Sequence, residues 1–504
     1  TIYYGVFIHS LSARELQVLE HALVAVSGDG VIVWVEENVP PSAIAESSLS
    51  HGWDISEVEI VRTSEGEWIM PGFIDTHTHA PQFPNLGRGQ EYQLLDWLEC
   101  ITFPTEARFS DVNYAKVAYE SVISRTLNVG TTTSCYYATL HTESSKVLAD
   151  IAHQKGMHFI NTHRMLCCYA YCPSGQRAFI GKCNMDRNSP SNYIEESVEK
   201  SICGTRDLIE HISKLDSPSE IAKPGYFPLV QPIITPRFAI SCTDELLSAM
   251  GKLFAERPPI PLQTHLSENT AEVSDTLKLF EHLNPPSDCL PPSHPKDKHT
   301  YTSVYDHFDL LDHRTILAHG VHLSEGELDL IVARKAGLSH CAGSNFNLRS
   351  GVASVGKWLD KGIKVGLGTD VSGGFAPSIL NEIRHASIAS KVRAMMDNPD
   401  SKKPSFRDPQ GLSVPTLLYL ATLGGASLCN LSDRVGSFVV GKEFDALFIS
   451  LSKPTSKANP AIWHEAGKKE DFKIMLERFF FCGDDRNIRR VWVQGKLVGG
   501  VDKT

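Results

Sequence analysis

The stretch PGFIDTHTH, residues 71–79, decides the fold class of this 504-residue chain. Pro71 and Gly72 introduce a short apolar run that is typical of a buried strand, and the run ends on His77 and His79. Residues two apart on a strand point to the same side, so both imidazoles face one point beyond the strand. An isolated HxH is more often a pair of polar strand-end residues than a pair of converging ligands. The rest of the chain has to decide between these two interpretations.

Seven further apolar runs follow the first, and amphipathic stretches such as 111–127 and 324–337 separate several of them. Strands that alternate with helices indicate an α/β protein with a parallel sheet, and eight strands favour a TIM-type (β/α)8 barrel. A doubly wound open sheet is the alternative, but no Gly-rich phosphate turn follows an early strand. The eight candidate strands are residues 73–79, 131–137, 158–166, 229–236, 260–268, 315–320, 337–344 and 364–370.

Both ends of the chain carry short β-type runs separated by Gly, Asp and Ser turns. We expect them to build one small β-sandwich domain together, with residues 1–70 as its first part and 436–504 as its second. Residues 71–435 then form the barrel. A segment rich in Pro, Ser and Asp near residues 283–300 is predicted to be a surface insertion in the barrel.

Composition narrows the class of protein. A formal net charge of -11 argues against a duplex nucleic-acid binder, because phosphate contacts need clustered Lys and Arg. No apolar stretch reaches the ~18 residues that a membrane-spanning helix needs, and the amino terminus does not resemble a secretory signal. The twelve cysteines show no paired zinc-finger spacing and are expected to be reduced thiols. We therefore expect a cytoplasmic enzyme with neither nucleic acid nor membrane as a partner.

Further ligand-type residues stand at the ends of later strands: His265 ends the fifth run, His319 the sixth and Asp370 the eighth. Barrel enzymes place their chemistry at the face formed by the carboxyl ends of the strands. Imidazoles and a carboxylate suit a divalent metal such as zinc and leave room for a water, although iron or manganese also fits. Such a metal lowers the pKa of its water towards about 7. Glu268 lies three residues after His265, where it can take a proton from that water. By itself, a glutamate at this position is more simply a solvated residue at a helix start.

The motifs between residues 70 and 375 resemble, in order, those of the guanine deaminases of the amidohydrolase superfamily. HxH and GTD mark the superfamily alone, whereas APQ after the histidines, FPTE and PRF are more specific. The motifs are PGFIDTHTHAPQ, WLECITFPTEARF, RAFIGKCNMD, TPRFAISC, QTHLSEN, LAHGVHLS, HCAGSNFNLRSG and GLGTDVSGG.

This resemblance implies hydrolytic deamination of guanine to xanthine and ammonia, with one divalent metal per chain and a homodimeric assembly. It implies that the metal ligands are His77, His79, His265 and Asp370. It places His319 close to the metal, where it orients the water or the substrate, and it assigns the proton transfer to Glu268 with Asp370. The residues implied to hold the purine are Gln82, Arg237, Phe238 and Glu268.

Two rivals remain at this level. A hydrolase that acts on another ring, such as a pterin or a triazine, shares the metal residues and differs in the pocket. A catalytically inactive barrel that serves as a scaffold is expected to lose one or more ligands, and every position is filled here. A smaller deaminase fold that uses HxE with PCxxC is set aside, because that pair of motifs is absent.

Overall fold

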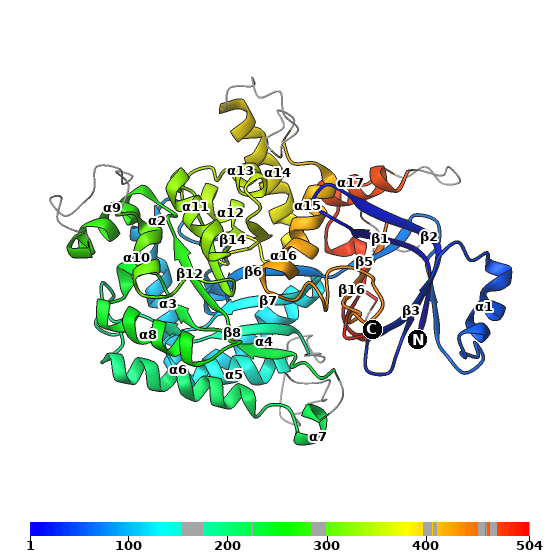
Figure 1. Ribbon diagram of the computed structural model, residues 1–504, viewed down its shortest axis with the longest axis horizontal. Coiled ribbons are helices and arrows are strands. Elements are labelled where there is room, and N and C mark those ends of the chain that lie inside the picture. The colour runs from blue at the N-terminus through cyan, green and yellow to red at the C-terminus, as the bar shows by residue number, and fades with distance from the viewer. Residues whose placement is uncertain are drawn as a thin grey trace.

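The computed structural model describes residues 1–153, 175–222, 225–283, 299–396, 406, 411–451, 459, 461–463 and 471–502. An eight-stranded parallel sheet occupies the centre, with helices around it, and a second sheet lies to one side (Figure 1). In spatial order the central strands are β10 (Val230–Pro232), β8 (Arg177–Gly181), β7 (Thr131–Tyr137), β6 (Phe73–His79), β15 (Lys364–Leu367), β14 (Gly337–His340), β13 (Thr315–His319) and β12 (Leu262–Leu266).

The central sheet closes into a barrel. A parallel bridge joins Ile234, just beyond β10, to Leu262 in β12, and the Gln263 N–H donates to the Ile234 carbonyl at 2.9 Å. The (β/α)8 expectation is therefore confirmed. The strand expected at 158–166 lies outside the described residues, and the third place in the barrel belongs to β8, which the sequence reasoning did not identify as a strand.

The helices around the barrel begin and end where the sequence provides caps. In α4 (Val112–Asn128) the Asp111 carboxylate accepts the N–H groups of Asn113 and Tyr114, and α11 (Glu325–Arg334) begins with a capping box between Ser324 and Glu327. The other surrounding helices are α5 (Thr142–His153), α6 (Val198–Ser213), α8 (Asp244–Glu256), α9 (Thr270–Leu279), α10 (Tyr301–His307), α13 (Val355–Asp360), α14 (Ile379–Met396), α15 (Val414–Ala421) and α16 (Leu423–Leu428).

The second sheet is built from both ends of the chain, as predicted. Its order is β18-β17-β16-β5-β1-β2-β3, with β4 paired to β1, so β5 joins the amino-terminal strands to the carboxyl-terminal ones. Aromatic rings from both ends meet in its core, where Tyr3 stacks on Phe444 with ring centroids 4.2 Å apart. The strands are β1 (Ile2–Ser10), β2 (Leu16–Val26), β3 (Ile32–Glu36), β4 (Ile60–Arg62), β5 (Glu67–Pro71), β16 (Ala446–Ser450), β17 (Ile488–Val493) and β18 (Lys496–Gly499).

The domain boundaries at 70 and 435 stay predictions. Helix α17 (Phe472–Cys482) belongs to the carboxyl-terminal region but packs against α14 and α15 of the barrel. Arg384 of α14 donates from Nε to the Phe480 carbonyl at 2.7 Å. The carboxyl-terminal region therefore contributes a helix to the barrel's outer layer as well as three strands to the small sheet.

Arg177, the first residue of β8, ties the barrel to the small β domain. It is fully buried, and its side chain donates to Asp445 from Nε at 3.0 Å and to Glu443 from Nη2 at 2.5 Å. Both carboxylates lie in the few residues that directly precede β16. This charge cluster connects the first residue of a barrel strand to the chain that enters the small β sheet.

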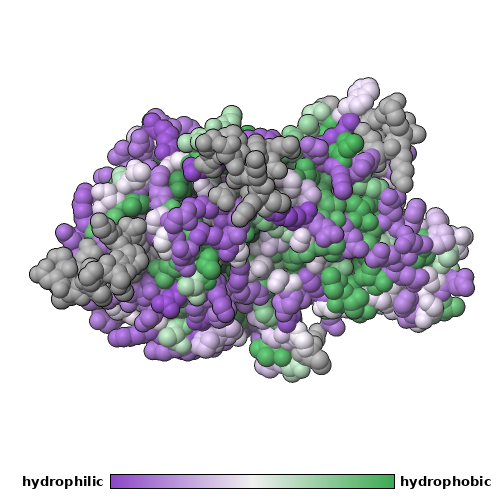
Figure 2. Space-filling view, turned by 45° about the horizontal axis from the view of Figure 1, so that its top comes forward, coloured by the Kyte–Doolittle hydropathy of each residue, from purple (hydrophilic) through white to green (hydrophobic). Residues whose placement is uncertain are grey.

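The outer surface carries mixed polarity. In Figure 2 most of the visible barrel surface is hydrophilic, and hydrophobic side chains gather where the small β domain meets the barrel. Among the described residues, none of the helices combines the length and the apolar character needed to cross a membrane. The predicted insertion near 283–300 lies almost entirely outside the described residues.

Candidate metal centre and substrate pocket

Five side chains converge at the carboxyl ends of the barrel strands. His77 and His79 come from β6, His265 from β12 and His319 from the end of β13, and Asp370 follows β15 by three residues. All five are buried. The sequence reasoning named every one of them, and the closed barrel brings them together because parallel strands end at the same rim.

Their separations suit ligands that share one ion. Four ligands ~2.1 Å from a tetrahedral metal lie roughly 3.4 Å from each other. The Nε2 atoms of His77 and His79 lie 3.2 and 3.3 Å from Asp370 Oδ1, and the Nε2 atoms of His79 and His265 are 3.1 Å apart. His319 Nε2 is farther from the carboxylate, at 3.8 Å from Oδ2.

The cluster has more candidates than a four-coordinate metal needs. One ligand atom from each of His77, His265, His319 and Asp370 lies within 4.8 Å of the others, so this set can also hold an ion. The shorter separations favour His79 over His319 as a ligand. The choice between them stays a prediction.

Hydrogen bonds select the tautomers of two of these histidines. His265 Nδ1 lies 2.5 Å from the Arg237 carbonyl, and His319 Nδ1 lies 2.9 Å from Asn345 Oδ1. A carbonyl oxygen can only accept, so Nδ1 carries the proton on each ring. In neutral rings this leaves the Nε2 lone pair facing the cluster, as metal ligation requires.

Charge states at the cluster also suit a cation. Burial lowers the pKa of His77 to about 4 and that of His265 well below its ordinary value, so both rings are neutral near pH 7. Burial alone would raise the pKa of Asp370, but the imidazoles of His77 and His79 beside it outweigh that effect and hold the pKa well below the usual range. Among the described residues, His77 makes no hydrogen bond through either ring nitrogen. Neutral imidazoles beside one carboxylate form a donor set that fits a divalent metal.

Glu268 lies beside the cluster rather than within it. Its Oε2 is 3.5 Å from His319 Nε2, and its Oε1 accepts the Ser350 hydroxyl at 3.1 Å. Burial raises its pKa to about 7, although His319 opposes the shift. A carboxyl with such a pKa can both accept and return a proton near neutral pH.

The backbone is unusual at the residues that follow the strands. Ser267, His319 and Asp370 adopt positive φ angles of 48°, 73° and 44°. Non-glycine residues adopt this region rarely, and such conformations cluster at functional sites. His319 and Asp370 therefore reach the cluster from backbone that turns at the ends of their strands.

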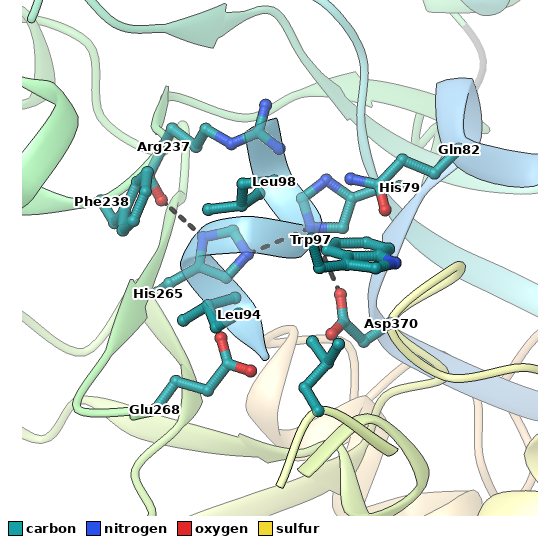
Figure 3. A pocket seen from close by; sticks show the side chains of 11 residues that line it. His79, Gln82, Leu94, Trp97, Leu98, Arg237, Phe238, His265, Glu268 and Asp370 are labelled. Atoms are coloured by element: carbon teal, nitrogen blue, oxygen red, sulfur yellow. Dashed lines mark hydrogen bonds and ion pairs between the residues drawn. The ribbon is translucent and has the colours of Figure 1, made fainter. Parts of the chain in front are cut away.

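A pocket of about 340 Å³ opens next to the cluster (Figure 3). Leu94 and Trp97 of α2 (Leu94–Trp97) and Leu98 of the π-helical turn η3 (Leu98–Thr102) supply apolar walls. The lining residues are His79, Gln82, Leu94, Trp97, Leu98, Arg237, Phe238, His265, Glu268, Leu348 and Asp370.

The four residues predicted to hold the substrate therefore line one pocket together with three of the predicted metal ligands, His79, His265 and Asp370. Gln82 comes from η2 (Ala80–Asn85), just after β6, while Arg237 and Phe238 follow β11 (Thr235–Pro236). The Phe238 ring lies 5.9 Å from that of His265. Their roles stay predictions, and their placement agrees with them.

Sequence reasoning missed the residue that organises this pocket from behind. Glu106 of α3 (Phe103–Ala107) is fully buried and accepts two hydrogen bonds from Arg237, at 2.6 and 3.1 Å. It also accepts from Gln82 Nε2 at 2.8 Å and from the Tyr193 hydroxyl at 2.7 Å. The Gln82 Oε1 in turn accepts the Ser372 N–H at 3.0 Å. A glutamate on the buried side of the FPTE segment was the available signal.

Comparison with known proteins agrees with this geometry. The profile of the amidohydrolase family matches residues 68–498, which span the barrel and much of the small β domain. The chain belongs to the amidohydrolase family. In this amidohydrolase the family match includes all the predicted metal ligands, Glu268 and the pocket residues.

The relatives are similar over the whole chain. A probable guanine deaminase of Schizosaccharomyces pombe is 42% identical over 99% of this chain and 84% of its own. The guanine deaminase of Homo sapiens is 36% identical, and the match covers 99% of this chain and 96% of the human protein. Among solved structures, a guanine deaminase from C. acetobutylicum with guanine in its active site superposes with a TM-score of 0.78 at 31% identity. That match covers 99% of each chain.

Proposed function

We propose that this amidohydrolase deaminates guanine hydrolytically and yields xanthine and ammonia. The observation that carries the proposal is the arrangement of Gln82, Arg237 and Phe238 around a pocket that also contains the histidine–aspartate cluster. The full-length similarity to guanine deaminases supports the same substrate.

We propose zinc as the metal, held by His77, His79, His265 and Asp370. Three imidazoles and a carboxylate match the ligand preference of zinc, and the spacing of their donor atoms matches its tetrahedral geometry. Iron and manganese accept the same ligand types and are the alternatives to be measured. A divalent metal in this position supplies an activated water near neutral pH.

Glu268 is assigned the proton transfers. Its carboxylate lines the pocket beside the cluster and can accept the first proton of the attacking water and pass it to the ring nitrogen of the purine. It can then take the second proton from the new hydroxyl group and give it to the departing amino group, so that ammonia leaves and an oxo group remains. His319 is assigned the orientation of the water or the substrate, and Asn345 holds its ring in one orientation.

The purine is assigned to the space between Phe238 and the polar side chains. Arg237 and Gln82 donate hydrogen bonds to acceptors on the ring edge, and Phe238 packs on the ring face. Guanine presents a carbonyl oxygen where adenine presents an amino group. A site with buried donors therefore disfavours adenine, by as much as ~10⁴-fold in favourable cases.

We also propose a homodimer in the cytoplasm. The resemblance to guanine deaminases implies the dimer, and exposed apolar side chains such as Val439 and Val440 provide surface for such contacts. Light scattering on the purified protein measures its mass, and a monomer at micromolar concentration would contradict the assembly. Imaging of a tagged chain tests the compartment.

The activity is tested with purified, metal-replete protein offered guanine, adenine, 8-oxoguanine and a triazine. We expect rapid ammonia release from guanine alone, xanthine as product, and loss of activity in Glu268→Gln. Glu325→Gln, at an exposed carboxylate on α11, serves as the matched control and should behave as wild type. Turnover of another ring without guanine would overturn the substrate, and inactivity on all four in metal-loaded protein would overturn the proposal.

A further inference from the structure

Glu106 stands behind the pocket and does not line it, yet it binds two polar residues that do, Arg237 and Gln82. Its two oxygens accept four hydrogen bonds, from Arg237 twice, from Gln82 and from Tyr193. Such a carboxylate is fully satisfied by protein donors. It has no spare acceptor for a proton or a substrate, so its effect has to pass through Arg237 and Gln82.

These contacts fix the orientation of both side chains. The Gln82 amide is held at both ends, because Nε2 donates to Glu106 and Oε1 accepts the Ser372 N–H. The Arg237 guanidinium is paired through both Nη atoms, and the Phe103 ring lies 5.2 Å from its centre. Two flexible side chains are thereby ordered before any ligand arrives, which reduces the entropy lost on binding.

The same pair determines the charge of the pocket wall. Burial opposes ionisation of both groups, but their mutual attraction outweighs it, so the pKa of Glu106 is lowered and that of Arg237 is raised. Both stay ionised, and their charges cancel within a hydrogen-bond distance. A ligand in the pocket therefore meets oriented donors without a net positive charge.

We propose that Glu106 is a positioning and specificity-determining residue, an inference that rests on the proposed deamination of guanine. It makes this pocket selective for a neutral purine over the more acidic product. Deamination replaces the amino group of the ring by an oxo group, and the additional ring N–H of a dioxopurine is more acidic than the N–H groups of guanine. An unpaired buried guanidinium would attract the resulting anion strongly. With Glu106 beside it, Arg237 binds the substrate carbonyl and still releases the product.

The test compares wild type with Glu106→Gln, both as full-length, metal-replete protein at a mildly alkaline pH where part of the xanthine is anionic. KM and kcat are measured with guanine, and Ki is measured with xanthine as product inhibitor. We expect the ratio of Ki to KM to fall about tenfold or more, because neutralising Glu106 favours the anion while the loss of orientation disfavours guanine. A ratio within about twofold of wild type in a folded variant would overturn the inference.

A matched control separates this effect from a general loss of structure. Glu382→Gln alters another fully buried glutamate, which accepts the Gly343 N–H and lies outside the pocket. It should lower stability and leave the ratio unchanged, since a purely structural defect moves Ki and KM together. An equal fall in this control would contradict the proposal.

If Glu106→Gln does not fold, Glu106→Asp keeps the charge and withdraws the carboxylate by one methylene. We then expect KM for guanine to rise about fivefold or more while kcat stays within about threefold of wild type. An unchanged KM would overturn the positioning role. Wild-type protein that does not deaminate guanine would refute the proposed function itself, whereas active wild type with an unchanged ratio refutes this inference alone.

Discussion

Replacing Arg177 by methionine is expected to destabilise the protein by about 3 kcal/mol. Removing one partner of a buried ion pair typically costs about 3–5 kcal/mol, because an uncompensated charge stays behind. The loss is partly offset here. Glu443 keeps Arg434 at 3.0 Å and Gln494 Nε2 at 2.9 Å, and Asp445 keeps the Gln494 N–H at 2.8 Å. The expected cost therefore lies at the lower end of that range.

This cost should depend on pH in a defined direction. In the wild type, burial raises the pKa of Asp445 against the opposing effect of Arg177, and burial of Glu443 is outweighed by Arg177 and its other donors, so the pKa of Glu443 is lowered. Without Arg177 both pKa values rise. A carboxyl whose folded pKa lies above its unfolded pKa destabilises the folded state increasingly as the pH rises from the unfolded value towards the folded one, so the penalty should be larger at about pH 8 than at about pH 5.

Urea unfolding followed by circular dichroism at both pH values measures the difference in the free energy of unfolding. Arg434→Met is the matched control, because Arg434 is partly exposed, pairs with Glu443 alone in this cluster and should cost about 1 kcal/mol or less. A cost of Arg177→Met that equals the control, or that shrinks as pH rises, would refute the reasoning.

Three further predictions concern the site. Ser350→Ala removes the hydroxyl that donates to Glu268 at 3.1 Å, so kcat on guanine should fall about tenfold or more with little change in KM; an unchanged kcat would contradict this orienting role. Gly368→Ala places a Cβ 2.8 Å from the Cβ of His77, so the purified variant should hold less metal than wild type by elemental analysis, and full loading would show that the crowding is relieved elsewhere. Chelation should abolish activity and lower the melting temperature, and added zinc should restore both, since a metal at ~1,000 times its Kd stabilises the folded state by about 4 kcal/mol; an unaltered melting temperature would contradict a buried metal.

Strand-end residues were predictable from sequence because local pattern and tertiary role coincide there. The run that ends at His79 is apolar, short and introduced by Pro71 and Gly72, and the structure places it as β6. The same holds for His265 in β12 and His319 in β13. These ligands lie at or near the ends of their strands, and closure of the barrel brings them together.

The elements that were missed depend on partners far along the chain. Strand β8 begins with a charged residue, Arg177, whose burial makes sense only with Glu443 and Asp445 more than 260 residues away. Glu106 meets Arg237 across 131 residues, and its place in the FPTE segment does not reveal that partner. Polar residues that act through long-range pairing have no periodic signature in the sequence.

The place of β5 has a consequence for how the chain is made. On the ribosome, β1 to β5 emerge first, but the neighbour that completes β5, strand β16, follows only after roughly 370 more residues. At about 5–20 residues per second, this unfinished sheet waits from about 20 seconds to over a minute with an open edge. Such edges pair readily with other chains. Nascent chains stalled before residue 446 should therefore aggregate through the β5 edge, while chains released after β18 should not.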